Sequence, residues 1–267
     1  MGVRYAEVIG DPIAHSKSPL IHKFWLAKLE IEADYRATHV QPGDLTGHFE
    51  HRRHDPDWAG CNVTMPHKAD VLRLADRADD AVNDIGSANT IIAYEGALAA
   101  HNTDIDGIIA ALGEEGLQKR PVLILGNGGA ARTTLAVLKS RRLEEVAIVA
   151  RDSAKSERLS ARFGLRLVEP EAPGLLINAS PLGMTGFDPM PETVLGLVDL
   201  MQPEGIVFDM VYSPPETQLI ARARQRGLKA IGGLDMLIGQ AEAAFRLFFG
   251  QPAPREHDAE LRGLLTS

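Results

Sequence analysis

One segment of the sequence combines the residue types that bind phosphate groups. The apolar run Val122–Leu125 is followed by Gly126-Asn127-Gly128-Gly129-Ala130-Ala131, which matches the pattern G-x-G-x-x-A. The first glycine permits a tight turn, the second lets the backbone approach a pyrophosphate, and the small third residue lets a helix pack against the strand. N–H groups at the start of that helix would then face the phosphates. The segment predicts a dinucleotide-binding turn, and a glycine turn without a ligand is the alternative.

The end of the next expected strand, Val146–Ala150, indicates which dinucleotide fits. An acidic residue there suits a ribose 2′-hydroxyl, whereas an arginine suits a 2′-phosphate. Arg151 favours NADP because its planar guanidinium matches the geometry of phosphate. Asp152 has the opposite effect, because a carboxylate repels a 2′-phosphate. The sequence therefore predicts NADP, with a modest preference over NAD.

The N-terminal half carries polar residues that a packed core would not need. Ser16 and Ser18 are two residues apart, so both hydroxyls can face one small anion or polyol. Ser18 is also expected to cap a helix whose first residue is Pro19. Lys68 follows the expected strand Cys61–Thr64, and ligands bind at this end of strands in open α/β sheets. A solvated surface lysine is the alternative.

Two further polar motifs, Asn89-Thr90 and Asn102-Thr103-Asp104, are suited to ligand binding or to turns. His48, His51 and His54 are spaced three apart, but no carboxylate or further histidine stands at ligand spacing, so no metal site is predicted.

Short β-branched runs alternate with amphipathic stretches, which is typical of α/β proteins. The expected strands are Glu7–Gly10, Tyr35–Val40, Cys61–Thr64, Ala88–Ala93, Val122–Leu125, Val146–Ala150, Leu175–Asn178 and Ile206–Met210. A last long helix is expected around Met236–Phe249. The polar stretch Gly113–Arg120 indicates that a domain boundary lies nearby.

Composition narrows the class of protein further. The 267 residues are 45% hydrophobic and 24% charged, which excludes a disordered or fibrous chain. No apolar run could cross a bilayer, and no signal peptide begins the sequence. The single Cys61 excludes an intrachain disulfide, so we expect a cytoplasmic protein. With a net charge of −8 and no basic run, nucleic acid is not an expected partner.

Six blocks of sequence, taken in order, resemble the shikimate dehydrogenase family over nearly the whole chain. They are Gly10-Asp-Pro-Ile-Ala-His-Ser-Lys-Ser-Pro19, Asn62-Val-Thr-Met-Pro-His-Lys68, Gly86-Ser-Ala-Asn-Thr90, Asn102-Thr-Asp104, Gly126-Asn-Gly-Gly-Ala-Ala-Arg132, and the C-terminal pair Asp209-Met-Val-Tyr212 and Gly233-Leu-Asp-Met-Leu-Ile-Gly-Gln240.

The resemblance implies a two-domain α/β fold with a cleft between the domains. It assigns residues 1–103, completed by C-terminal helices at 237–267, to a substrate-binding domain and residues 104–236 to a Rossmann-type NADP domain. The implied activity is reversible NADP-dependent reduction of 3-dehydroshikimate to shikimate, a step in making aromatic compounds, by a monomer or homodimer.

The resemblance also implies roles for individual residues. Lys68 and Asp104 resemble the catalytic pair. Ser16, Ser18 and Tyr212 resemble the hydroxyls that hold the substrate carboxylate, and Thr64, Asn89 and Gln240 resemble the groups that read its ring hydroxyls. The implied cofactor contacts are Gly126, Asn127, Gly128, Gly129, Ala130, Arg151, Met210, Gly233 and Met236. No metal is implied.

The sequence departs from the family pattern at the 2′-phosphate site, where the usual Asn-Arg-Thr reads Ala150-Arg151-Asp152. Two alternatives follow: an NAD-preferring quinate/shikimate dehydrogenase, suggested by Asp152, and a non-catalytic NADP-binding regulator. The intact Lys68 and Asp104 favour an enzyme, because a regulator would not need them.

Overall fold

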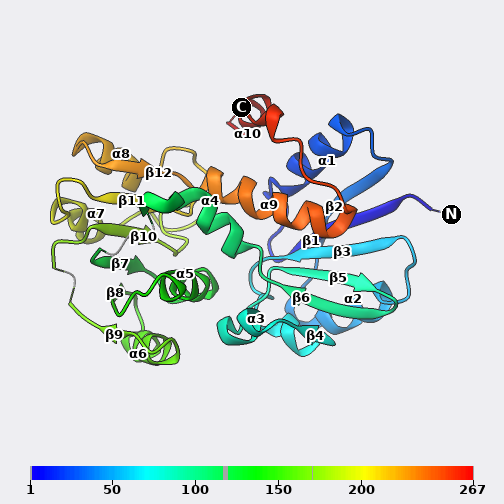
Figure 1. Cartoon of the computed structure of the whole chain (residues 1–267), viewed down its shortest axis with the longest axis horizontal. Coiled ribbons are helices and arrows are strands. Elements are labelled where there is room, and N and C mark those ends of the chain that lie inside the picture. The colour runs from blue at the N-terminus through cyan, green and yellow to red at the C-terminus, as the bar shows by residue number, and fades with distance from the viewer. Residues whose placement is uncertain (1, 117–119, 170, 267) are drawn as a thin grey trace. The chain divides into compact units, whose positions relative to one another are not determined.

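The structure is a computed structural model that describes residues 2–116, 120–169 and 171–266. The chain forms two compact units, which we call the first unit, residues 1–103 with 240–267, and the second unit, residues 104–239. Figure 1 shows the order of their helices and strands. Each unit has its own sheet and its own apolar core.

The first unit is built on a six-stranded mixed sheet. Its strands are β1 (Arg4–Gly10), β2 (Ala33–His39), β3 (Trp58–Val63), β4 (Arg77–Ala78), β5 (Thr90–Tyr94) and β6 (Ala97–His101), in the order β2-β1-β3-β5-β6-β4. Strand β1 runs parallel to β2 and β3, whereas β5 is antiparallel to β3 and β6. The carboxyl ends of β1 and β3 therefore meet the start of β5 at one edge of the sheet.

Both faces of this sheet are covered by helices. The helical segments are α1 (Ser18–Lys28), α2 (Leu45–Arg52), α3 (Asp80–Ile85), α10 (Asp258–Thr266) and the end of α9 (Gly233–Phe249), with short 3-10 turns at Pro42–Asp44, Asp70–Arg73 and Arg255–His257. Phe49 of α2 packs with Tyr5 on one face, while Phe248 of α9 packs with Val8 on the other. Alternate residues of β1 thus supply two separate cores.

The start of α1 differs from the expectation. Lys17 occupies the N-cap position with helical backbone angles, and Ser18 is the first helical residue. The Ser18 N–H donates to Ser16 Oγ at 3.3 Å, and no described side chain caps the helix. The prediction that Ser18 caps this helix is therefore wrong.

The second unit contains an all-parallel sheet. Its strands are β7 (Val122–Leu125), β8 (Glu145–Val149), β9 (Arg166–Leu167), β10 (Leu175–Asn178), β11 (Ile206–Asp209) and β12 (Lys229–Ile231). Their order, β9-β8-β7-β10-β11-β12, is the 3-2-1-4-5-6 order of doubly wound dinucleotide-binding folds. The strand order reverses between β7 and β10, where such folds bind their ligands.

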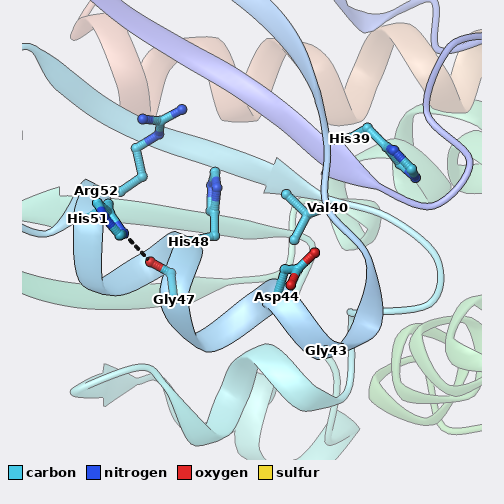
Figure 2. A pocket seen from close by; sticks show the side chains of 8 residues that line it. All are labelled: His39, Val40, Gly43, Asp44, Gly47, His48, His51 and Arg52. Carbon is cyan, nitrogen blue, oxygen red and sulfur yellow. Dashed lines mark hydrogen bonds between the residues drawn. The ribbon is translucent and has the colours of Figure 1, made fainter.

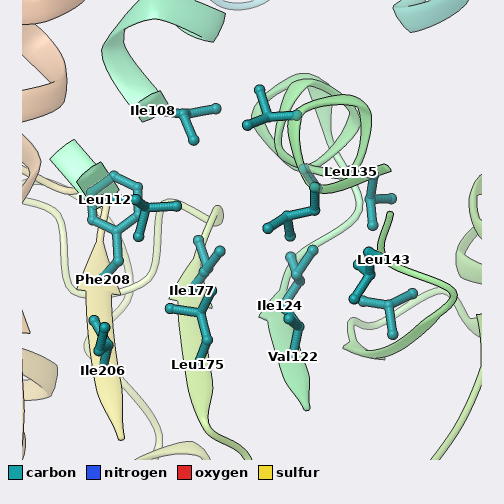
Figure 3. Packing of buried hydrophobic residues seen from close by; sticks show 14 of the residues in the cluster. Ile108, Leu112, Val122, Ile124, Leu135, Leu143, Leu175, Ile177, Ile206 and Phe208 are labelled. Carbon is teal, nitrogen blue, oxygen red and sulfur yellow. The ribbon is translucent and has the colours of Figure 1, made fainter. Parts of the chain in front are cut away.

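Helices cover both faces of this second sheet, and Figure 3 shows the packing on one of the two faces. They are α4 (Asp104–Gly116), α5 (Gly129–Ser140), α6 (Ser153–Arg162), α7 (Glu192–Asp199), α8 (Gln218–Gln225) and the start of α9. On the face drawn, Ile108 of α4 and Leu135 of α5 pack with Ile124 and Ile177. On the opposite face, Leu123 belongs to a second cluster with residues of α7 and α8.

The expected α/β class is confirmed, and the element boundaries shift by up to three residues. The strands β4, β6, β9 and β12 were not expected, because three of them have two or three residues and β6, Ala97–His101, is rich in alanine. The change of unit falls at 103/104 instead of near 113–120, because Ile108 and Leu112 pack in the second core. Part of that polar stretch, residues 117–119, lies outside the described residues.

Candidate active site

The glycine turn of the second unit lies at the point where the strand order reverses. Gly126 has a φ of +97°, and a Cβ there would lie 3.2 Å from the Ala179 carbonyl oxygen. Gly128 takes the N-cap position of α5, and a Cβ added to it would meet no described atom within 4 Å. No described side chain caps α5, so its first N–H groups, at Gly129 and Ala130, suit a phosphate.

In the connection after β8, Arg151 and Asp152 have different roles. Asp152 Oδ1 accepts a hydrogen bond from the Lys155 N–H at 2.8 Å and caps α6. Asn127 joins this connection to the glycine turn, because its amide nitrogen donates to the Asp152 carbonyl at 2.8 Å and to Ser156 Oγ at 3.1 Å. Arg151 is exposed. The carboxylate thus has a local helical role, which leaves Arg151 as the charged group suited to a 2′-phosphate.

A buried polar network holds the segment that follows β11. Asp209 is fully buried and accepts hydrogen bonds from Asn178 Nδ2 at 2.9 Å, the Val211 N–H at 3.0 Å and Thr217 Oγ1 at 2.6 Å. Burial raises the pKa of Asp209, although these three hydrogen bonds act in the opposite direction. Asn178 Oδ1 also accepts from Ser180 Oγ at 2.6 Å. The network therefore joins the ends of β10 and β11.

Met210, Tyr212, Gly233 and Met236 lie on or beside that segment. Gly233 begins α9 so close to it that an added Cβ would lie 2.3 Å from the Met210 carbonyl oxygen. Met236 is 9% exposed and packs mainly in the core of the second unit. Tyr212 is partly buried, and this burial raises the pKa of its hydroxyl.

Helix α9 carries two of the predicted site residues, Met236 and Gln240. A contact at Gly239 shows where this helix lies in the second unit. A Cβ at Gly239 would lie 2.8 Å from Ala110 Cβ, so α9 packs closely on α4. Asp104, 5% exposed, begins α4, and its charge suits the positive end of the helix dipole. Gln240, 8% exposed, is the next residue of α9 and belongs to the first unit.

In the first unit, the turn that carries Thr64 and Lys68 is attached on both sides. His67, 1% exposed, has Nε2 2.7 Å from the Val40 carbonyl oxygen, so its imidazole bonds to the backbone. The Lys68 carbonyl accepts from the Ala88 N–H at 2.8 Å. The turn is therefore bound to the end of β2 and to the residue before Asn89.

Asn89 belongs to a chain of buried polar side chains. Its Oδ1 accepts from the Thr103 N–H at 2.7 Å, and its Nδ2 donates to Thr103 Oγ1 at 3.0 Å. Asn62 Nδ2 donates to Thr90 Oγ1 at 3.0 Å, because Asn62 and Thr90 are directly paired across β3 and β5. Thr90 Oγ1 lies 3.0 Å from Asn89 Oδ1, which completes the chain.

The first unit thus brings Thr64, Lys68 and Asn89 to one edge of its sheet, with Ser16 in the loop after β1 and Ser18 at the start of α1. Hydroxyl, amide and ammonium groups of this kind suit a small polar molecule with several hydroxyls and a negative charge. The second unit carries the predicted cofactor residues, Asp104 and Tyr212.

Four residues support these sites through hydrogen bonds that the sequence did not predict: Tyr35, Asn62, Thr103 and Asp209. Three of them lie inside the quoted motifs, so a search for buried partners of the motif residues could have found them. Tyr35 has no such signal, because an aromatic residue in a strand is ordinary.

A surface pocket of about 500 Å³ lies elsewhere in the first unit, beside α2 (Figure 2). Its basic groups already have partners. Arg52 Nε donates to Glu7 at 2.7 Å, His39 lies 2.8 Å from Asp11, and His51 Nδ1 lies 2.7 Å from the Gly47 carbonyl. None of the predicted site residues lines the pocket, and its paired charges do not define a ligand.

The described part of the chain contains no helix long and apolar enough to cross a membrane. It also contains no cluster of three or more histidine, cysteine or acidic residues arranged to hold a metal ion.

A doubly wound sheet with a glycine turn at its reversal point, in one chain with a second α/β unit, defines a two-domain protein with a Rossmann-type domain. Residues 8–91 match the family model "Shikimate dehydrogenase substrate binding domain", and residues 233–260 match "Shikimate 5'-dehydrogenase C-terminal domain". The shikimate dehydrogenase (NADP(+)) of Sphingopyxis alaskensis is 47% identical over 270 residues, which are 98% of this chain and 97% of the relative. The chain belongs to the shikimate dehydrogenase family.

Solved structures agree with this assignment. The shikimate 5-dehydrogenase of Thermus thermophilus in complex with NADP(H) and shikimate matches with a TM-score of 0.86 and 33% identity, over 98% of this chain and 99% of that one. The Listeria monocytogenes enzyme in complex with shikimate and NAD matches with a TM-score of 0.85 and 27% identity, over 97% and 96% of the two chains.

Proposed function

We propose that this protein catalyses the reversible NADP-dependent reduction of 3-dehydroshikimate to shikimate. One observation carries the proposal for the substrate: the Lys68 turn is hydrogen-bonded to Ala88, beside an Asn89 whose amide is oriented by Thr103. Rigidly held groups of this kind suit a substrate that presents a ketone and several hydroxyls at fixed positions. The relatives named for this reaction support the same substrate.

Reduction of a ketone requires a hydride, a proton and polarisation of the carbonyl group. NADPH, when bound, supplies the hydride. We assign the proton and the positive charge at the developing alkoxide to Lys68. The Asp104 carboxylate is suited to accept a hydrogen bond from a substrate hydroxyl.

The remaining predicted residues hold the substrate. Ser16, Ser18 and Tyr212 are proposed to donate hydrogen bonds to its carboxylate. Ser16 suits this role because its oxygen accepts from the Ser18 N–H, which leaves its own O–H to donate to a ligand. Thr64, Asn89 and Gln240 are proposed to read the ring hydroxyls.

The second unit supports NADP over NAD. Asp152 suggested an NAD-preferring enzyme because a carboxylate at this position can bind the ribose. In the structure this carboxylate caps α6 instead. Arg151, exposed at the end of β8, is the proposed 2′-phosphate contact. The turn from Gly126 to Ala130, held by Asn127, is the proposed pyrophosphate contact.

Steady-state assays of the purified protein with shikimate and quinate, each with NADP⁺ and with NAD⁺, test the proposal. We expect the highest kcat/KM for shikimate with NADP⁺. Higher kcat/KM for quinate with NAD⁺ would establish the first alternative. Tight NADP binding without turnover of either substrate would establish a regulator. A cytoplasmic location and a monomeric or homodimeric state stay predictions.

A further inference from the structure

Hydrogen bonds from two side chains join the connections that carry the proposed phosphate contacts of the cofactor. Asn127, in the glycine turn after β7, donates from Nδ2 to the Asp152 carbonyl oxygen at 2.8 Å and to Ser156 Oγ at 3.1 Å. Ser156 is 2% exposed on α6, and its Oγ donates to the same carbonyl oxygen at 3.2 Å. We call this closed group, the side chains of Asn127 and Ser156 with the Asp152 carbonyl, the strap.

The protons of the strap determine what the Asn127 side chain can bind. Its amide nitrogen has two N–H protons, and the two hydrogen bonds of the strap engage both of them. A carbonyl oxygen only accepts hydrogen bonds, so the amide nitrogen and not the amide oxygen faces Asp152. An ionised pyrophosphate also only accepts, and the engaged amide offers it no donor. The Asn127 side chain therefore bonds to the protein, although it stands in the phosphate-binding motif.

The strap links the two places where the charged groups of NADP are proposed to bind. Asn127 stands between Gly126 and Gly128 in the proposed pyrophosphate contact. Asp152 directly follows Arg151, the proposed 2′-phosphate contact. A site that holds both contacts in place before the cofactor arrives loses less conformational freedom when it binds NADP. NAD has no 2′-phosphate, so it uses only the first of the two contacts and gains little from their fixed spacing.

Other hydrogen bonds keep the glycine turn and α6 in place without the strap. The Gly126 N–H donates to the Val149 carbonyl at 2.8 Å, which holds the turn beside the end of β8. The Asp152 carboxylate caps α6 through the Lys155 N–H at 2.8 Å. Loss of the strap should therefore loosen Arg151 relative to the turn and leave the turn and the helix formed.

We propose that Asn127 and Ser156 are positioning residues that set the preference for NADP over NAD through Arg151. The inference rests on the NADP site of the function proposed above. It assigns the strap an effect on cofactor selectivity but none on the substrate or on hydride transfer.

The test measures the dissociation constants of NADP⁺ and NAD⁺ for the full chain by isothermal titration calorimetry. Asn127→Ala removes both hydrogen bonds of the amide, so NADP⁺ should bind about three- to tenfold more weakly, with NAD⁺ binding changed less than about twofold. Ser156→Ala leaves the bond from Asn127 to the Asp152 carbonyl and should lower the NADP⁺ selectivity by a smaller factor. In the Arg151→Ala background, neither variant should weaken NADP⁺ binding more than NAD⁺ binding, because the residue through which they act is absent.

Ser160→Ala is the matched control for Ser156→Ala. Ser160 is 4% exposed on the same helix, and its Oγ donates to the Glu157 carbonyl at 3.0 Å. The control therefore removes a buried serine hydroxyl whose hydrogen bond stays within α6, and it should leave the selectivity at the wild-type value.

The outcomes separate this inference from the proposed function. A wild type that binds neither cofactor, or binds NAD⁺ more tightly, overturns both. A wild type that prefers NADP⁺ but does not oxidise shikimate overturns the proposed function alone.

Given a wild type that prefers NADP⁺, three results overturn only the strap. They are an Asn127→Ala variant that weakens both cofactors equally or neither, a selective effect that persists in the Arg151→Ala background, and a Ser160→Ala variant that lowers the selectivity as much as Ser156→Ala does. If Asn127→Ala does not fold, Ser156→Ala and its control decide the same question.

Discussion

Among individual residues, the buried titratable side chains respond to pH in different directions. Glu7 is fully buried, and burial raises its pKa, but the His48 imidazole 3.3 Å away and the hydrogen bonds from Arg52 and Thr38 outweigh this effect and lower the pKa to about 2. Glu7 therefore contributes stability above its unfolded pKa that is lost only as the pH falls from about 4.5 toward 2. His22 has no such compensation: neither ring nitrogen has a hydrogen-bond partner among the described residues.

His22→Phe is expected to remove a pH-dependent loss of stability. Burial lowers the pKa of His22 from 6.5 to about 3, so below pH 6.5 the unfolded chain binds a proton that the folded protein does not. The free energy of unfolding of the wild type should therefore fall by up to about 1.4 kcal/mol per pH unit between these values. Urea unfolding at pH 7, 6 and 5 measures the difference between the two proteins.

In that range the Phe variant should lose less stability than the wild type, because phenylalanine can stack on Tyr35 as the His22 imidazole does and takes up no proton. Glu7 and Asp209 are unchanged in the variant, so their contributions cancel in the comparison. Equal slopes for the two proteins would mean that His22 is accessible to protons in the folded state.

Lys68→Ala tests the catalytic assignment. We expect kcat to fall by about 10²–10⁴, as for loss of a proton-transfer group. The fold should persist, because the turn is held by the Lys68 backbone carbonyl and by His67, and the substitution leaves both in place. The rate of shikimate oxidation and the circular dichroism spectrum of the purified variant are the measurements. Turnover near the wild-type rate would remove Lys68 from the mechanism.

At the scale of elements, the connections that follow parallel strands decide what each strand end can bind. After β7 the backbone itself faces the ligand side, because the glycines there carry no side chain. After β8 the chain turns directly into α6, and Asp152 is used to begin that helix. A residue that has the right charge for ribose recognition therefore serves a local structural need instead.

Arg151→Ala is expected to weaken NADP⁺ binding selectively and to leave NAD⁺ binding almost unchanged, because a charge-assisted contact with the 2′-phosphate is lost. Asp152→Ala should instead lower stability by about 0.5–2 kcal/mol through loss of the helix cap. Arg246→Ala, on an exposed part of α9, controls for the change in net charge. The dissociation constants of both cofactors for the wild type and the variants measure this selectivity. If the wild type binds NAD⁺ more tightly than NADP⁺, Asp152 contacts the ribose.

At the scale of the whole molecule, ligand binding is coupled to folding. A ligand that binds only the folded protein stabilises it by about 2.7 kcal/mol at one hundred times its dissociation constant. We expect NADP⁺ and shikimate each to raise the thermal midpoint of the wild type. Differential scanning calorimetry of the wild type and of Lys68→Ala is the measurement, and the variant should keep the NADP⁺ shift. No shift with either ligand would contradict binding altogether.

The sequence by itself determined the features that depend on neighbouring residues. The strands Val122–Leu125 and Leu175–Asn178 have the predicted bounds, and the Gly126 turn follows from a backbone geometry that glycine adopts at little cost. The α/β class follows from the same alternation of short patterns. Asp152 was also a local signal, and its capping role was missed because it was considered only as a ligand contact.

Only the tertiary structure decided which polar side chains meet. Tyr35 and Asn62 are 27 residues apart, Asn178 and Asp209 are 31 apart, and Glu7 and Arg52 are 45 apart. Each pair depends on strand order and register, and a shift of one residue in register turns a side chain to the opposite face of the sheet. Local patterns predict strands and turns, whereas the partner of a buried polar group depends on residues that the fold brings together from distant parts of the chain.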